Sequence, residues 1–401
     1  MTRPPSLLSI YARAALGAVT KNHSLPSSFT ATGILPNNNR VKLSLDIPEE
    51  DLPFTINRLH VRQFRRVVDD NVSANLHTSE IPVSYLQCLL NCLPMNQLTH
   101  ANFPLNIVGS VHESIQITSH NPIPIDADTI PLQARCFVHP EMELSDKQDW
   151  IFTVVTLVQD LNTEEQGERE EDNPLPIMTI TNKYRILNPQ RNKLKNNSHT
   201  PKTIQPPEQD YENQKHWKQL AKWNFPVDSG RKYASLNGDI NPIHMHPLSA
   251  KLFGYKSCIA HGMHSLCKLW SVLETNTEIQ RNLRVQHTLT EDNHYEDDGD
   301  CRQEVTITAR FVRPTLLPNP AVVAFWKPSS MSDTNTKITK SADGVDDSVL
   351  LLHDNANAVN KSYDYVIGTR HGQKDNQFKE TVKGSIQITT ATATSTSTST
   401  S

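Results

Sequence analysis

Residues 229–254 read SGRKYASLNGDINPIHMHPLSAKLFG, and the short segment IAHGM follows at residues 259–263. Glycine is rare in this chain, with 13 among 401 residues, yet four glycines lie between Gly230 and Gly262. Glycine permits tight turns and lets other groups approach the backbone closely. We therefore expect the chain to turn sharply here and to build a compact site.

Local sequence signals predict two short helices in this region. One begins at Asp228 or Ser229 and ends before Gly238, and the other begins near Pro247 and is terminated by glycine. The intervening loop carries a carboxylate and an imidazole five residues apart, which can face the same small volume. Such a pair suits general acid–base catalysis because imidazole titrates near neutral pH. The pattern predicts a proton-transfer site.

The segment Tyr233–His244, together with Ile259–Met263, resembles the hydratase motif of the MaoC-like family of hotdog-fold dehydratases. Within that family it is most similar to the (R)-specific enoyl-CoA hydratases, also called hydratase 2. The resemblance implies reversible hydration of trans-2-enoyl thioesters to (R)-3-hydroxyacyl thioesters, with no metal and no redox cofactor. Two hotdog units in one chain, of which one carries the motif, resemble the eukaryotic double-hotdog members.

The resemblance also implies roles for single residues. Asp239 and His244 match the acid–base pair that activates water for attack at the β-carbon and protonates the α-carbon. Asn241 matches a position that helps to hold the water and the pair. Gly262 matches the glycine whose backbone N–H points at the thioester carbonyl, where a helix N-terminus favours developing negative charge. Motif residues and neighbouring basic residues are assigned to substrate binding: Tyr233, His261, Arg231 and Lys251.

The order of predicted elements repeats in the two halves of the chain. In the first half, Val83 to Leu98 has the spacing of an apolar helix, and residues 150–158 and 177–186 have the β-branched pattern of a hairpin. In the second half an apolar helix from about Gly262 to Leu273 precedes strand candidates at 303–313, 321–326, 349–352, 363–367 and 378–388. We expect an α+β fold of two hotdog domains, each an antiparallel sheet around a central helix.

Composition shifts suggest the boundaries of these units. We expect an N-terminal extension at 1–40, a non-catalytic hotdog domain at 41–190, a polar linker at 191–210, the catalytic MaoC-like hotdog domain at 211–390 and a disordered Ser/Thr tail at 391–401. The first half lacks the motif, since Asn75 stands five residues after Asp70 and no His-Gly-Met segment follows. We expect this half to be catalytically silent and to supply the pocket for the acyl tail.

Composition also excludes several classes of protein. The net charge is −4 at pH 7, which argues against a nucleic-acid partner, and no apolar stretch reaches the roughly 20 residues of a membrane-spanning helix. Six dispersed cysteines without a CxxC pair indicate an intracellular, reducing compartment. No acidic residue precedes Asp46, so the N-terminus is interpreted either as a mitochondrial transit peptide or, from Leu7 to Val19, as the first helix of the mature protein. Mitochondrial and cytoplasmic locations both stay open.

Rival interpretations stay open as well. His244, His246, His261 and His264 form an HxH and an HxxH pattern that a zinc or iron ion would use if the side chains converged. The same fold also suits a non-catalytic acyl-thioester-binding scaffold. Among enzymes, the substrate carrier is either coenzyme A or acyl carrier protein, and the sequence does not separate a homodimer from a single chain.

Overall fold

The structure is a computed structural model that describes residues 7–21, 40–42, 47–68, 81–120, 123, 129–145, 149–161, 176–187, 211–212, 214–275, 302–329, 359–370 and 378–391. The first half contains α1 (Leu7–Thr20), β1 (Arg40–Lys42), β2 (Glu50–Asn57), α2 (Arg58–Val68), α4 (Val83–Leu89), α5 (Cys92–Thr99), β3 (Val111–Ser119), β4 (Thr129–Leu144), β5 (Trp150–Asp160) and β6 (Met178–Ile186). The second half contains β7 (Lys218–Phe225), α7 (Ser229–Asn237), α8 (Pro242–Met245), α9 (Pro247–Leu252), α10 (Gly262–Thr275), β8 (Arg302–Phe311), β9 (Asn319–Pro328), β10 (Val359–Arg370) and β11 (Phe378–Ala391).

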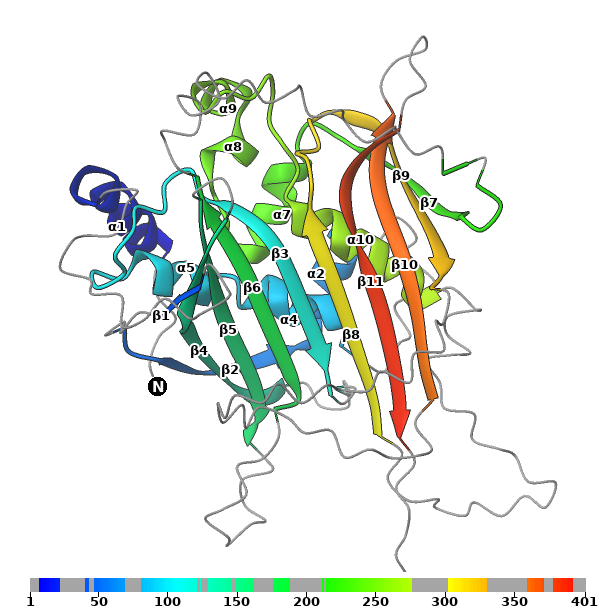
Figure 1. The fold of residues 1–401 in the computed structure, drawn as a ribbon, viewed down its shortest axis with the longest axis horizontal. Coiled ribbons are helices and arrows are strands. Elements are labelled where there is room, and N and C mark those ends of the chain that lie inside the picture. The colour runs from blue at the N-terminus through cyan, green and yellow to red at the C-terminus, as the bar shows by residue number, and fades with distance from the viewer. Residues whose placement is uncertain are drawn as a thin grey trace, which may run out of the picture.

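The described strands form one antiparallel sheet whose two halves mirror each other. Its order is β4-β5-β6-β3 in the first half and β8-β11-β10-β9-β7 in the second, with β1 and β2 both paired to β4. Figure 1 shows β3 and β8 side by side at the middle of the sheet, with α2, α4 and α10 behind it. The predicted α+β class, with antiparallel strands and helices in each half, is confirmed.

The seam between the halves is the pairing of β3 with β8. It runs from Ser114 opposite Arg310 to Ser119 opposite Val305. Side chains reinforce it: the Thr118 and Thr306 hydroxyls lie 3.0 Å apart, and His120 Nδ1 lies 2.8 Å from Glu304 Oε2. One hydrophobic cluster extends from β2 to β11, so the halves share a core as well as a sheet.

The predicted helix from Val83 to Leu98 is wrong as a single element, because the structure has two helices, α4 and α5, separated by a turn. Pro94 lies in the first turn of α5. In a continuous helix its ring would clash with the Leu90 carbonyl and its missing N–H would leave that carbonyl unpaired. The break therefore lies where the proline requires it.

The other predicted helices correspond to α1, α7, α9 and α10, and the predicted strands that lie among the described residues are paired in the sheet. The β5–β6 hairpin pairs from Trp150 opposite Ile186 to Val158 opposite Met178. Four of the strand candidates in the second half correspond to β8, β9, β10 and β11. The candidate at 349–352 lies outside the described residues.

The expected domain boundaries stay predictions. The linker at 191–210 and the tail, apart from its first residue Ala391, lie outside the described residues, as do Asp70 and Asn75. Among the cysteines that the structure describes, all five are free thiols: Cys88, Cys92, Cys136, Cys258 and Cys267.

None of the helices in the described part of the chain has the length and apolar character needed to cross a membrane.

Close packing inside the sheet gives a first prediction, at Gly384 of β11. A Cβ atom added there would lie 1.8 Å from the Thr308 carbonyl oxygen of β8 and 2.7 Å from the Tyr365 hydroxyl of β10. Gly384→Ala should therefore destabilise the fold by about 3 kcal/mol, the upper part of the range for overpacked cores. Gly17→Ala is the control, because its Cβ would meet only Lys21 Cδ at an ordinary 3.7 Å. Equal thermal unfolding midpoints for the two variants would contradict the packing argument.

Candidate active site

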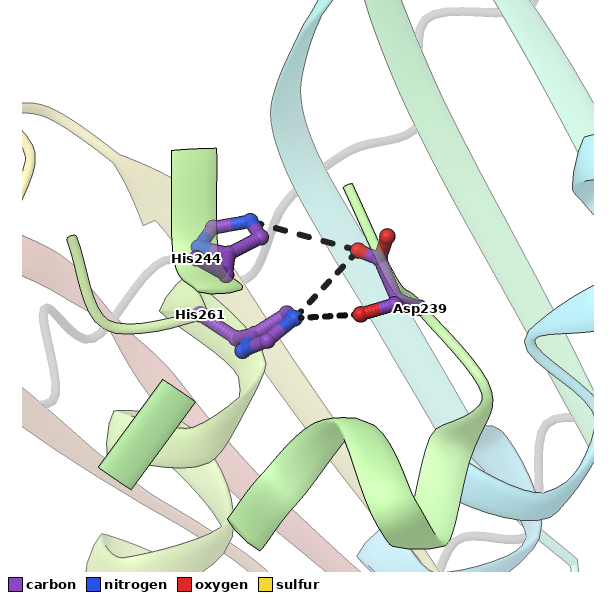
Figure 2. A group of neighbouring side chains, drawn as sticks. All are labelled: Asp239, His244 and His261. Carbon is purple, nitrogen blue, oxygen red and sulfur yellow. Dashed lines mark hydrogen bonds and ion pairs between the residues drawn. The ribbon is translucent and has the colours of Figure 1, made fainter. Parts of the chain in front are cut away.

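Three predicted site residues meet in one cluster. The Asp239 Oδ2 atom lies 4.0 Å from His244 Nε2 and 3.5 Å from His261 Nε2. His261 Nε2 also lies 3.2 Å from the backbone oxygen of Asp239, and the two imidazole rings stack with centroids 3.6 Å apart. Figure 2 shows both rings directed at the Asp239 carboxylate from one side.

Asp239 is positioned by the end of α7 and by its own loop. Gly238 adopts a left-handed φ of 72° and ends the helix, which suits a residue without a Cβ. The Asp239 N–H then donates to the Asn237 side chain at 2.9 Å. The Oδ1 atom accepts two hydrogen bonds, one from the Asn241 N–H at 3.0 Å and one from the Tyr11 hydroxyl at 2.9 Å. Consequently Oδ2 is the oxygen that faces the histidines.

His244 lies on α8, a single turn that begins with the N-cap residue Asn241 and Pro242. Its Nδ1 atom lies 2.8 Å from the Ile259 carbonyl oxygen, which can only accept, so Nδ1 carries the proton. In the neutral ring the lone pair is then on Nε2, directed toward Asp239. Gly230 of α7 allows α8 to approach, because a Cβ there would lie 2.2 Å from the His244 carbonyl oxygen.

His261 precedes α10 and is held by a short backbone pairing. The Ala260 N–H donates to the Thr315 carbonyl at 2.8 Å, and the Leu317 N–H donates to the Cys258 carbonyl at 2.8 Å. The Pro-rich segment after β8 therefore supports the site. Because His261 Nε2 faces the backbone carbonyl of Asp239, Nε2 carries the proton, while the buried Nδ1 has no partner among the described residues.

Burial and hydrogen bonding set the charges of the cluster. Burial lowers the pKa of His244 below its ordinary value, although Asp239 and the Ile259 carbonyl act in the opposite direction. Burial lowers the pKa of His261 to about 3. Burial alone would raise the pKa of Asp239, but the imidazoles, the Asn241 N–H and the Tyr11 hydroxyl outweigh it and hold that pKa below its usual range. At neutral pH the site therefore contains a carboxylate and two neutral imidazoles.

The separation of Asp239 from His244 suits a shared water molecule. A distance of 4.0 Å is too long for a direct hydrogen bond, and one water can bridge it. The Asp239 side chain is 27% exposed, whereas those of His244 and His261 are 9% and 4% exposed. A small molecule would therefore reach the cluster on the carboxylate side. The arrangement can take a proton from water and return one to a bound molecule.

The four-histidine metal set of the rival interpretation does not assemble. His246 is exposed and accepts from the Leu248 N–H as the N-cap of α9, and His264 is buried against Phe225 and Tyr233. Among the described residues, Asp239, His244 and His261 each offer a ligand atom within 4.8 Å of the others, a set that would suit zinc or iron. A metal bound through His261 Nε2 would displace the proton that this nitrogen donates to the Asp239 backbone.

Three other predicted residues take positions that sequence reasoning describes only in part. Asn241 contacts Asp239 through its backbone N–H, while its side chain caps α8. Gly262 begins α10, where a Cβ would lie 2.4 Å from the Phe311 ring. Tyr233 is fully buried, with its hydroxyl 3.5 Å from Cys267 Sγ, which gives it packing contacts behind the histidines instead of a surface for substrate.

The two basic residues assigned to substrate lie outside the cluster. Arg231 is exposed on α7, and its guanidinium donates to the Met245 carbonyl at the end of α8 at 2.9 Å. Lys251 is exposed on α9. A role for either residue in binding a carrier phosphate stays a prediction.

Two residues of the first half lie near the cluster, and sequence reasoning did not single out either of them. Tyr11 of α1 contacts Asp239 directly. His112 of β3 packs between Tyr184 and Phe311, and its buried Nε2 has no partner among the described residues. Burial lowers the pKa of His112 to about 4, and the nearby charge of Asp239 opposes that shift. The sequence gives no signal for these contacts, since they join residues that lie far apart along the chain.

Comparison with known proteins identifies relatives of this chain. Residues 203–288, which contain the whole cluster except Tyr11, match the MaoC-like domain family. The 3-hydroxyacyl-thioester dehydratase X of Mycobacterium tuberculosis is 27% identical over 321 residues, which cover 80% of this chain and 89% of the relative.

Solved structures share the fold. The crystal structure of HtdX from Mycobacterium tuberculosis aligns with a TM-score of 0.50 and 17% identity, covering 84% of this chain and 99% of that one. A MaoC-like dehydratase from Phytophthora capsici aligns with a TM-score of 0.51 and 13% identity, covering 88% of this chain and 98% of that one. These similarities extend over both halves, so the two-unit architecture belongs to the relatives as well.

The hydrogen bonds of His244 predict its protonation state. At neutral pH the ring should be neutral with the proton on Nδ1, as the Ile259 carbonyl requires. Proton–nitrogen correlation spectra of histidine-labelled protein measure this, with the His244 signals assigned by their loss in His244→Gln. Gly230→Ala should disturb the signals, since its Cβ would displace the His244 backbone, whereas Ser235→Ala, on the exposed side of α7, should not. A proton on Nε2 of wild-type His244 would contradict the assignment.

Proposed function

We propose that this chain is a MaoC-like hotdog-fold dehydratase and that it interconverts trans-2-enoyl thioesters and (R)-3-hydroxyacyl thioesters by adding or removing water. The observation that carries the proposal is the geometry: Asp239 Oδ2 lies 4.0 Å from Nε2 of His244, the nitrogen that is left as an acceptor when Nδ1 donates to the Ile259 carbonyl. The name of the mycobacterial relative, a 3-hydroxyacyl-thioester dehydratase, supports the same class of substrate.

In this proposal Asp239 and His244 hold the reacting water between them. As the water oxygen bonds to the β-carbon, one member of the pair accepts a proton from it, and the electrons of the double bond move toward the thioester carbonyl. The pair then delivers a proton to the α-carbon, so both groups return to their starting state. Dehydration follows the same steps in reverse. His261 would hold Asp239 in place by donating its Nε2 proton to the Asp239 backbone oxygen, with the same nitrogen 3.5 Å from Oδ2 and its ring stacked on that of His244.

The N-terminus of α10 is the proposed site for the thioester carbonyl. Negative charge develops on that oxygen during hydration, and the first N–H groups of a helix stabilise such charge. Gly262 begins this 14-residue helix, beside His261. The absence of a Cβ there leaves room that the Phe311 ring occupies, so Phe311 is the side chain next to the proposed carbonyl position.

We favour coenzyme A as the carrier, with acyl carrier protein as the alternative enzyme substrate. Exposed basic residues on α7 and α9, Arg231 and Lys251, would meet phosphates of either carrier. The first half, in this proposal, is the non-catalytic hotdog domain and lines the path of the acyl tail. A scaffold that only binds acyl thioesters is the second candidate, and turnover distinguishes it.

Substitution of the acid–base pair should abolish most activity. With crotonyl-CoA and a longer trans-2-enoyl-CoA, loss of the conjugated-thioester absorbance measures hydration, and chiral analysis of the product should show the (R)-alcohol. Asp239→Asn and His244→Ala should each reduce turnover by about 100- to 10,000-fold, the usual contribution of a general acid–base group.

His246→Ala is the matched control, since this histidine belongs to the same motif but only caps α9 on the surface. It should keep near wild-type turnover. Near-normal rates in both site variants would refute these roles, and a folded wild type without turnover on coenzyme A or acyl carrier protein thioesters would favour the scaffold. Adding a chelator to the same assay tests whether a metal at Asp239, His244 and His261 contributes.

The direction of the His244 shift predicts the pH dependence of kcat/KM, which reports the free enzyme. The neutral ring is the active form and its pKa is lowered, so activity should be constant near neutrality and fall on acidification with a midpoint below 6.5. The pKa of Asp239 is lowered from an ordinary value of 3.8, so protonation of this carboxylate should not limit activity near neutrality. An acid limb centred at or above the ordinary histidine value would contradict the lowered pKa.

A further inference from the structure

We propose that Tyr11, on the N-terminal helix α1, is a positioning residue for the acid–base pair. Its hydroxyl holds one oxygen of Asp239 so that the other faces the histidines. The contact joins residues 228 positions apart, and Tyr11 lies in the half of the chain that lacks the hydratase motif. This inference rests on the proposed function, since the group it positions is the proposed catalytic carboxylate.

Helix α1 is anchored to the first half by several contacts. Ile10, next to Tyr11, is buried with 1% of its surface exposed. The Arg13 guanidinium donates to Asn96 and, at 3.3 Å, to the Thr99 hydroxyl of α5. Lys21 then donates to the His100 carbonyl at 2.8 Å. Figure 1 shows α1 beside α5 at one side of the molecule. The helix thus has a fixed place from which Tyr11 reaches Asp239.

The two hydrogen bonds to Oδ1 of Asp239 fix the orientation of the carboxylate. The Tyr11 hydroxyl and the Asn241 N–H both donate to this oxygen, at 2.9 and 3.0 Å. Rotation of the carboxylate would break both bonds, so Oδ2 stays directed at His244 and His261. Hydrogen bonds to the charged form also favour ionisation of a carboxyl group, and Tyr11 acts in that direction on the Asp239 pKa.

Tyr11 is suited to remain a donor throughout the reaction. Burial, followed by the neighbouring Asp239 charge, raises the pKa of its phenol far above the ordinary value. The hydroxyl therefore keeps its proton at any pH at which the enzyme works. It neither supplies nor removes a proton in the proposed reaction, which is why its role is orientation of the carboxylate.

This assignment bears on the two interpretations of the N-terminus. A transit peptide removed after import would take Tyr11 away if cleavage fell after residue 11. Our proposal requires residues from Tyr11 onward to stay in the active protein. Any processing must then occur before this position.

The test compares Tyr11→Phe with the wild type, in the full chain. The variant keeps the ring and loses only the donor, so we expect kcat to fall about 10- to 100-fold, as small misplacements of reacting groups do, while KM changes little. Leu16→Ala is the matched control: it lies on the same helix, is 62% exposed, and should leave both constants unchanged.

A second measurement separates orientation of a charge from simple packing. A carboxyl group whose pKa is lower in the folded state than in the unfolded state stabilises the fold at pH values above its unfolded-state pKa, here 3.8. This stabilisation is lost as the pH falls through the folded-state pKa. The difference in unfolding midpoint between wild type and Tyr11→Phe should therefore be larger at neutral pH than below pH 3.8. A difference independent of pH indicates lost packing and overturns the inference.

The outcomes distinguish this inference from the function on which it rests. Absence of turnover in the folded wild type refutes the proposed function, and the unfolding measurement then still tests the Tyr11–Asp239 contact. Normal turnover in the wild type with an unchanged kcat in Tyr11→Phe overturns the positioning role alone. A large rise in KM at constant kcat also overturns it, because that result would indicate contact with substrate.

Discussion

The antiparallel pairing of β3 with β8 determines which groups can reach the Asp239 cluster. It joins two sheet–helix units edge to edge and fixes their register from Ser114 to Ser119. His112 and Phe311 lie at one end of this seam and pack on each other, and Phe311 continues to Gly262 at the start of α10. The half without the motif is thereby brought against the half that carries it. Helix α1 completes the arrangement from the opposite end of the chain.

Within this arrangement, two backbone carbonyls determine which ring nitrogen of each histidine carries the proton. The Ile259 carbonyl faces Nδ1 of His244, and the Asp239 carbonyl faces Nε2 of His261. The two stacked rings therefore differ at the Nε2 atom that faces Asp239, which is an acceptor in His244 and a donor in His261. Their stacking at 3.6 Å would be costly if both were charged, and burial keeps both neutral.

Much of this could be predicted from the sequence where the signal is local. The glycines and prolines of residues 229–254 predict the turns that bring Asp239 near His244, and periodicity predicts α10 and the strands β5, β6 and β8–β11. The single helix from Val83 to Leu98 was wrong because Pro94 stops the helix despite its apolar spacing. Sequence patterns did not single out β3 as a strand, and nothing local indicated its pairing with β8. Contacts such as Tyr11 with Asp239 depend on that long-range pairing, so no window of sequence contains them.

The mirrored strand order also leaves β1 and β2 at one outer limit of the described sheet and β7 at the other. Unpaired edges invite strands from other molecules, which leads to aggregation. Pro53 of β2 has no N–H to offer an added strand, and Lys218 and Lys222 place positive charge along β7. The pairing of β3 with β8 covers one edge strand of each half. At the outer edges, the proline of β2 and the lysines of β7 oppose the addition of a further strand. Pairing of β2 or β7 with a strand of another molecule is therefore disfavoured by the residues of these edge strands.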